Sequence, residues 1–335
     1  MIRLTEQQVQ AFDLLRGHRR AIVQGCAGSG KTVLATEKAR QLSDEGLRVL
    51  LLCYNKRLAR RLAADVEDCV NVTANNFHSL AMATIKRAEL ELDWDVDAQE
   101  LWDRQVPERL VDAIVATEER YDAVVVDEGQ DFAASWWSPI QWLLEDEEDG
   151  IVYIFMDNNQ RLYDRSRELP IDSEPFSLTL NCRNTRHIHD FVKSFFSGES
   201  VPQVDGPVGR PVEIIRCRDS SDLGPAVLAK FQRLFGREKV DLGDVIVLTG
   251  HGARRSQLNG LQGEGFRIEV GPRKKKCVEL ESIYGFKGLE RPIVALADLE
   301  DLDEDRIDRL MYVGASRAQS HLLVFAPEGL VLPAM

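Results

Sequence analysis

The chain has 335 residues, of which 44% are hydrophobic and 29% are charged, a balance typical of a soluble globular protein with room for two domains. Asp and Glu number 55 against 42 Lys and Arg, and the net charge of −13 argues against a protein that coats nucleic acid through its overall charge. The six cysteines include no Cys-x-x-Cys pair, which argues against a disulfide framework or a zinc knuckle. No apolar run has the length of a membrane span and the N-terminus lacks the pattern of a signal peptide, so we expect a cytoplasmic protein with no membrane partner.

The first strong motif is a phosphate-binding loop near the N-terminus. Residues 25–32 read Gly-Cys-Ala-Gly-Ser-Gly-Lys-Thr, with an apolar strand pattern before them and a helical pattern after them. We expect Lys31 to reach the β- and γ-phosphates and the Thr32 hydroxyl to ligate Mg²⁺. The backbone of the loop is expected to surround the phosphates through Gly25, Ala27, Gly28, Ser29 and Gly30. A chance match in a glycine-rich loop is disfavoured by this strand–loop–helix context.

Short apolar runs alternate with stretches of helical length along the whole chain. Strands are expected at residues 21–23, 49–53, 123–126, 151–155, 178–180, 212–215, 245–248, 277–282, 293–295 and 321–325. This alternation predicts an α/β fold of parallel sheets with crossover helices, in which most strands are buried on both faces. The polar segment 164–175 contains Pro170 and predicts a linker. We therefore expect domains at residues 1–170 and 171–335.

A pair of carboxylates follows the strand predicted at residues 123–126. Asp127 comes directly after four apolar residues, and Glu128 is next to it. A phosphate loop needs a carboxylate at the end of a neighbouring strand to hold the metal, and Asp127 is the candidate. Glu128 is expected to orient and deprotonate the attacking water. The pattern therefore predicts hydrolysis of a nucleoside triphosphate.

Two further groups of residues have ordinary structural interpretations. Near-helical spacing predicts core or packing residues at Trp136, Trp137 and Trp142. A sparse group of potential metal ligands lacks further ligands at regular spacing, and it consists of Cys182, His187 and His189. Neither group predicts a ligand site.

The order of the remaining motifs resembles that of the UvrD/Rep-type superfamily 1 DNA helicases, from the first residues to about Ala318. Residues 4–8 are similar to the Q-motif, and residues 157–163 and 181–185 are similar to two motifs that contact the γ-phosphate. Residues 287–290 are similar to a motif that contacts the ribose, and residues 312–318 are similar to the last arginine motif. The resemblance implies two RecA-like domains with accessory insertions reduced or absent. It implies a nucleotide site that includes Gln8 at adenine, Gln160, Arg183 and Arg317 at the γ-phosphate, and Gly288 and Glu290 at the ribose.

The same resemblance implies contacts with a nucleic-acid strand. Residues 54–56 and 77–79 are similar to the strand-contacting motifs of the family's first domain. The strand-contacting residues that it implies are Tyr54, Asn55, Phe77, His78, Tyr163 and Tyr284. Strand bases would stack on aromatic faces, and arginines from the second domain would couple hydrolysis to domain motion.

The chain departs from the family in several places. Val33 and Cys182 stand where the family has the residues that sandwich adenine, which leaves Gln8 as the main adenine reader, and Arg165 stands where it has a strand-stacking tryptophan. The gaps that hold whole accessory domains in full-length relatives are short here, about fifty residues before Asp127 and about a hundred after Arg183. The chain resembles the two-domain motor alone, as in the ATPase half of proteins that carry a nuclease-related (NERD) domain.

We therefore expect an ATP-dependent DNA helicase or translocase that uses ATP and Mg²⁺ and moves, by resemblance, in the 3′ to 5′ direction. Its expected partners are single-stranded DNA or a tailed duplex, and an attached nuclease domain or partner protein. Two alternatives stay open: an RNA-directed motor of the same superfamily, and a nucleotide-gated module that switches a partner nuclease without translocating. A small-molecule kinase is disfavoured because no acceptor site is apparent.

Overall fold

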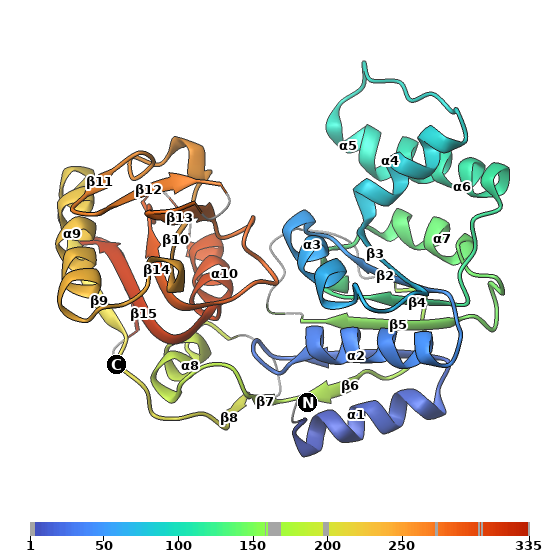
Figure 1. The fold of residues 1–335 in the computed structure, drawn as a ribbon, viewed down its shortest axis with the longest axis horizontal. Coiled ribbons are helices and arrows are strands. Elements are labelled where there is room, and N and C mark those ends of the chain that lie inside the picture. The colour runs from blue at the N-terminus through green and yellow to red at the C-terminus, as the bar shows by residue number, and fades with distance from the viewer. Residues whose placement is uncertain are drawn as a thin grey trace. The chain divides into compact units, whose positions relative to one another are not determined.

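The computed structural model describes residues 4–157, 159, 169–196, 201–271, 274–300, 302 and 304–333 (Figure 1). Its contacts divide the chain into two units, Met1–Leu178 and Thr179–Met335. The boundary lies later than the one predicted after residue 170, because strand β6 (Phe176–Leu178) pairs with strand β1 (Arg20–Gly25) of the first unit. The strand predicted at residues 178–180 is wrong for the same reason, since β6 ends at Leu178 and β7 (Leu180–Asn181) belongs to the second unit.

The described part of the first unit contains one six-stranded sheet in the order β3-β2-β4-β5-β1-β6, and all its neighbouring strands are parallel. Besides β1 and β6, its strands are β2 (Val49–Cys53), β3 (Val72–Asn76), β4 (Ala123–Val126) and β5 (Ile151–Met156). The central strands β2 and β4 are buried along their whole length, as their continuous apolar sequences predict. Because the strands are parallel, the segments that follow them all leave the sheet at one edge.

Helices cover both faces of this sheet. Helix α2 packs on one face, whereas α4, α6 and α7 pack on the other (Figure 1). The helical elements of the unit are α1 (Glu6–Gly17), α2 (Lys31–Asp44), α3 (Lys56–Asp65), α4 (Phe77–Arg87), α5 (Ala98–Glu100), η1 (Leu101–Gln105), α6 (Val106–Thr117), η2 (Gly129–Asp131) and α7 (Ala134–Trp142). Trp136 and Trp137 are buried in the core and Trp142 packs against it, which confirms their predicted structural role.

The segment between β3 and β4 holds only the helices α4, α5, η1 and α6. Helix α4 packs on α6, and α6 packs on α7, so these helices extend the core of the first unit rather than build a separate domain. The predicted reduction of the accessory insertions is confirmed here.

The described part of the second unit contains a seven-stranded sheet in the order β11-β12-β13-β10-β14-β15-β9, and a small pair of β7 with β8 (Gln203–Val204). Its neighbours are parallel except for the β11–β12 pair. The strands are β9 (Glu213–Cys217), β10 (Val245–Thr249), β11 (Gln262–Gly263), β12 (Phe266–Val270), β13 (Cys277–Ser282), β14 (Arg291–Ala297) and β15 (Ala318–Pro327). The helical elements are α8 (Arg186–Lys193), α9 (Ser220–Gln232), η4 (Arg233–Arg237), η5 (Leu242–Asp244), η6 (Ala253–Arg255) and α10 (Glu304–Ala315).

The predicted fold class is confirmed: the chain is an α/β protein with two RecA-like units, each with a sheet of mainly parallel strands flanked by helices. The sequence did not predict strands β3, β8, β11 and β12, which are short or polar. Within the described ranges, the structure contains no helix that is both long enough and apolar enough to span a membrane.

Candidate nucleotide site and nucleic-acid interface

The phosphate loop connects β1 to α2 at the carboxyl edge of the first sheet. Gly28 and Gly30 have φ angles of +77° and +84°, a backbone conformation that glycine adopts without strain. The Lys31 ammonium donates to the carbonyl oxygens of Gly25 at 2.8 Å and Cys26 at 2.9 Å, and the side chain is only 6% exposed. The loop is therefore closed around its own lysine.

Gln8 ties helix α1 to this loop. Its Oε1 accepts from the backbone N–H of Thr5 at 2.9 Å, and its Nε2 donates to the carbonyl oxygen of Ser29 at 2.9 Å. A Cβ at position 30 would lie 2.2 Å from Gln8 Nε2 and would displace the end of that side chain, and the φ of +84° there further disfavours any residue but glycine. One end of the amide caps helix α1 and the other bonds to the phosphate loop, and the reading of adenine by Gln8 stays a prediction.

Asp127 and Thr32 are brought together, as the sequence predicted for a metal site. Asp127 is fully buried, its Oδ1 accepts from the N–H of Glu128 at 3.0 Å, and its pKa is raised to about 7, mainly by burial and then by the charge of Glu128. The Thr32 hydroxyl lies within hydrogen-bonding reach and opposes that shift. Asp127 Oδ2 is buried and has no hydrogen-bond partner among the residues that the structure describes. One orphaned carboxylate oxygen beside a hydroxyl fits Mg²⁺, which takes few protein ligands and completes its shell with phosphate and water.

Glu128 is held in a strained turn after β4. Its φ of +58° lies in the left-handed region, where a residue with a side chain is uncommon and costs energy that functional sites often retain. A Cβ at position 129 would lie 2.5 Å from Ile154 Cγ2, so Gly129 lets the turn pack directly on β5. The Glu128 side chain is 4% exposed, and Gln130 Nε2 donates to its Oε2 at 2.5 Å.

Gln130 connects Glu128 to the segment that follows β5. Its Oε1 accepts from the backbone N–H of Asp157 at 3.0 Å, and the Asp157 carboxylate lies 3.6 Å from the Lys31 ammonium. A continuous polar network therefore runs from Lys31 through Asp157 and Gln130 to Glu128. The sequence assigned no role to Gln130 or Asp157, since only the packing of β4 beside β5 brings them together.

Replacing Gln130 with leucine is expected to lower kcat for ATP by about tenfold or more and to leave the KM for Mg-ATP nearly unchanged. Glu128 would lose the donor that orients it, whereas the phosphate loop would stay intact. The same change in a Glu128→Gln background should have little further effect, because both residues act on one step. Steady-state kinetics of the four chains measure this coupling, with Gln10→Leu on the exposed face of α1 as the control. Additive losses would contradict a shared role.

The predicted strand contacts of the first unit follow β2 and β3 at the same edge as the phosphate loop. Asn55 Oδ1 accepts from the N–H of Arg57 at 2.7 Å and so caps helix α3. Phe77 is fully buried and stacks on Trp136, with ring centroids 4.2 Å apart and planes 7° apart. No face of the Phe77 ring is exposed, so Phe77 is a core residue. The prediction that it contacts the nucleic-acid strand is wrong.

Tyr54 and His78 surround the same tryptophan but are only partly buried. Their ring centroids lie 6.0 Å and 4.9 Å from that of Trp136, and 5.3 Å from each other. The aromatic core thus fixes these two rings at the surface end of the cluster. Tyr54 and His78 stay predicted strand contacts.

The second unit brings its two predicted arginine segments together. Asn184 Nδ2 donates to the carbonyl oxygens of Ser316 at 3.1 Å and Ala318 at 2.5 Å, on either side of Arg317. Asn181 Nδ2 donates to Asn184 Oδ1 at 2.6 Å, and its Oδ1 accepts from the N–H of Arg183 at 3.0 Å. These two asparagines were not predicted to act, although they flank Arg183 in the sequence.

Both arginines are engaged with groups of their own unit. Arg183 Nε lies 2.5 Å from the Glu290 carboxylate, the residue expected at the ribose. Arg317 is 1% exposed, and its guanidinium donates to the carbonyl oxygens of Val313 at 3.0 Å and Leu289 at 3.4 Å. The described structure therefore gathers Arg183, Arg317 and Glu290 around the segment that contains Gly288. A phosphate would have to replace the present partners of the arginines.

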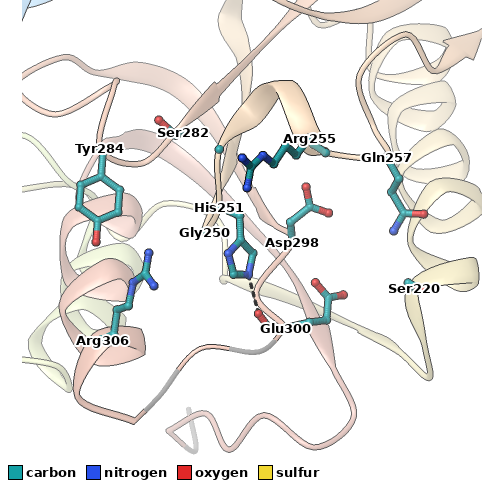
Figure 2. A pocket seen from close by; sticks show the side chains of 12 residues that line it. Ser220, Gly250, His251, Arg255, Gln257, Ser282, Tyr284, Asp298, Glu300 and Arg306 are labelled. Atoms are coloured by element: carbon teal, nitrogen blue, oxygen red, sulfur yellow. Dashed lines mark hydrogen bonds between the residues drawn. The ribbon is translucent and has the colours of Figure 1, made fainter. Parts of the chain in front are cut away.

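Three further predicted residues remain: two are not described by the structure, and the third lines a cavity of the second unit. Gln160 and Tyr163 lie outside the described residues, as does the departure at Arg165. Tyr284 lines a cavity of about 930 Å³ in the second unit (Figure 2), and the Arg306 guanidinium lies 6.0 Å from the centroid of its ring.

The phosphate loop, the Asp127–Glu128 turn and the parallel sheet give the first unit the features of a P-loop nucleotide-binding domain. A family model described as an AAA domain matches residues 8–165. Among solved structures, the chain is similar to that described as "Crystal structure of Arterivirus nonstructural protein 10 (helicase)", at 13% sequence identity and a TM-score of 0.43. That match covers 95% of this chain and 62% of the viral chain, so the present chain spans less than two thirds of that structure.

Proposed function

We propose that the chain is an ATP-hydrolysing motor of the superfamily 1 helicase type that moves on single-stranded DNA in the 3′ to 5′ direction. The observation that carries the proposal is the buried network from Lys31 through Asp157 and Gln130 to Glu128. It connects the group that would contact the γ-phosphate to the base that would activate water and to the segment that leaves β5. Such a network can report the state of the nucleotide to the surface of the unit.

The first unit supports a simple sequence of events. Bound Mg²⁺, held by Thr32 and Asp127, would supply positive charge to the phosphates. Lys31 exchanges its loop carbonyl partners for phosphate oxygens and thereby leaves Asp157. Glu128, oriented by Gln130, accepts the proton of the attacking water. Asp157 then loses its cation, and because Gln130 accepts from the backbone N–H of Asp157 and donates to Glu128, that loss would be felt at Glu128.

The proposed strand track lies beside this chemistry. Tyr54 follows β2 and His78 follows β3, so both leave the sheet at the edge where the phosphate loop and Glu128 lie. Aromatic faces of this kind stack on bases without regard to sequence. A change at Asp157, which follows β5, would reach the strand through the same edge of the sheet.

We expect single strands to raise ATP turnover several-fold and long tailed duplexes to be unwound poorly by this chain alone. The helices between β3 and β4 form no separate domain to split a duplex, and the net charge of −13 provides no broad electrostatic hold. The measurement is ATP turnover with single-stranded DNA, single-stranded RNA, duplex or no nucleic acid, followed by single-turnover strand separation with a trap.

The outcomes separate the alternatives. Stronger stimulation by RNA would make the chain an RNA-directed motor. If no nucleic acid changes the rate of ATP turnover, the motor hypothesis is contradicted. That result would favour a nucleotide-gated module that acts on a partner nuclease. Efficient unwinding by the chain alone would show that the two units suffice without accessory domains.

A further inference from the structure

A cavity of about 930 Å³ opens in the second unit where three neighbouring parallel strands end (Figure 2). Gly250 and His251 follow β10, Ser282 ends β13, and Asp298 follows β14. Arg255 and Arg306 also line it. Ligands of open parallel sheets commonly bind outside the carboxyl ends of the strands, so the position suits a binding site.

Asp298 gives the cavity a buried acceptor. Its side chain is 8% exposed, and its Oδ2 accepts no hydrogen bond from any described residue. Its φ of +49° is in the left-handed region, and a Cβ at Gly250 would lie 2.8 Å from the Asp298 carbonyl oxygen, so the local backbone is constrained to this form. Burial raises the pKa of this carboxyl above its ordinary value, and a hydrogen bond from the Ser256 side chain opposes that shift, so only the Oδ2 oxygen lacks a partner among the described residues. An unpartnered buried acceptor is costly, and a ligand with an N–H or O–H group would relieve that cost.

The other walls offer an aromatic face and hydrogen-bond donors. His251 Nε2 lies 2.6 Å from the carbonyl oxygen of Glu300, so Nε2 is its protonated nitrogen. In Figure 2, Tyr284 and Arg306 lie on the left of the view, whereas His251, Arg255 and Asp298 lie near its centre. The cavity thus presents a flat ring, an acceptor and guanidinium donors.

This composition does not suit a phosphate. The positive charges of Arg255 and Arg306 are matched by the carboxylates of Asp298 and Glu300, and a carboxylate acceptor repels phosphate oxygens. It suits a nucleobase, which has flat faces and carries donors and acceptors on its edges. Guanine fits best, because arginine donates well to its O6 while a carboxylate accepts from its N–H groups.

We propose that this cavity binds one guanine base of the nucleic-acid strand, with Asp298 as the acceptor for its N–H groups, Arg255 as the donor to its O6, and Tyr284 against its face. The inference rests on the proposed function, since it assumes that a strand passes the second unit. The cavity would give the motor a preference for one base, whereas its other proposed strand contacts do not distinguish between bases. The motor would then dwell longer at guanines than at thymines.

The experiment measures equilibrium binding of short thymidine strands that carry one central guanine, inosine, thymine or abasic site. The wild-type chain is expected to bind the guanine strand about tenfold more tightly than the thymine strand, in the range of one good base contact. Inosine, which lacks the 2-amino group, should lose part of this preference. Asp298→Asn should remove it, and asparagine tolerates the left-handed backbone at this position.

Glu264→Gln is the matched control, because it removes one negative charge from an exposed position of the same unit. It should keep the guanine preference. If Asp298→Asn and Glu264→Gln both bind every strand more tightly by the same factor, Asp298 acts only through its charge and the proposal is overturned. Equal wild-type binding of all four strands overturns the base pocket alone, whereas no binding of any strand by the wild type overturns the proposed function itself.

Discussion

Replacing Lys31 with alanine is expected to abolish measurable ATP turnover. The ammonium is the phosphate loop's only direct charge for the β- and γ-phosphates, and in the described structure it lies 3.6 Å from the buried Asp157 carboxylate. The substitution leaves that carboxylate, which is 1% exposed, without its cation. Breaking a buried pair in this way costs about 3–5 kcal/mol of stability, so a lower Tm should accompany the loss of activity.

A second variant separates the two effects. Lys31→Ala combined with Asp157→Asn removes both charges, and we expect it to recover most of the lost stability while turnover stays absent. Thermal unfolding and ATP hydrolysis of the two variants provide the measurement. If the double variant has the same low Tm as the single variant, the unpaired Asp157 carboxylate is not the cause of the lost stability. If either variant hydrolyses ATP at a normal rate, Lys31 has no phosphate role.

Replacing Arg183 or Arg317 with alanine is expected to lower kcat by about a thousandfold while ADP affinity changes little. Arginines that stabilise the transferring phosphate are worth about 10³ or more in kcat, and ADP lacks the γ-phosphate they would contact. The two variants should differ in stability. Arg183→Ala frees a half-buried Glu290 carboxylate, whereas Arg317→Ala removes the donor from the carbonyl oxygens of Leu289 and Val313. We expect only Arg317→Ala to destabilise the second unit clearly.

Arg216 is the matched control for these two arginines. Its guanidinium donates to the carbonyl oxygens of Pro327 at 3.2 Å and Leu330 at 2.6 Å. Arg216 is exposed and lies on β9 opposite Ala326, at the other end of β15 from Arg317. Arg216→Ala should leave kcat unchanged. The measurements are kcat, ADP binding and unfolding for all three variants. A parallel loss of ADP binding in Arg183→Ala and Arg317→Ala would contradict a role that is specific to the γ-phosphate.

Local sequence determined the phosphate loop, the Asp127–Glu128 pair and most strands of both sheets. These features depend on short-range chemistry: a glycine-rich turn before a lysine, and continuous apolar runs that fit only strands buried on both faces. Strands β2 and β4 have the bounds that their apolar runs predict, and β13, whose apolar and polar residues alternate, also has its predicted bounds. The polar edge strand β3 lacks that signal, and the end of the first unit at Leu178 depends on pairing with a strand some 150 residues earlier.

Only the tertiary structure decided which side chains meet. The motif of residues 77–79 predicts that Phe77 is a surface aromatic residue, but stacking on Trp136 makes it a core residue. Gln130 reaches Asp157 over 27 positions, and Asn184 reaches Ser316 over 132. Asp298 Oδ2, which has no partner in the part of the chain that the structure describes, lies where three strands of the second sheet end. Such contacts follow from long-range packing, which no local pattern of residues encodes.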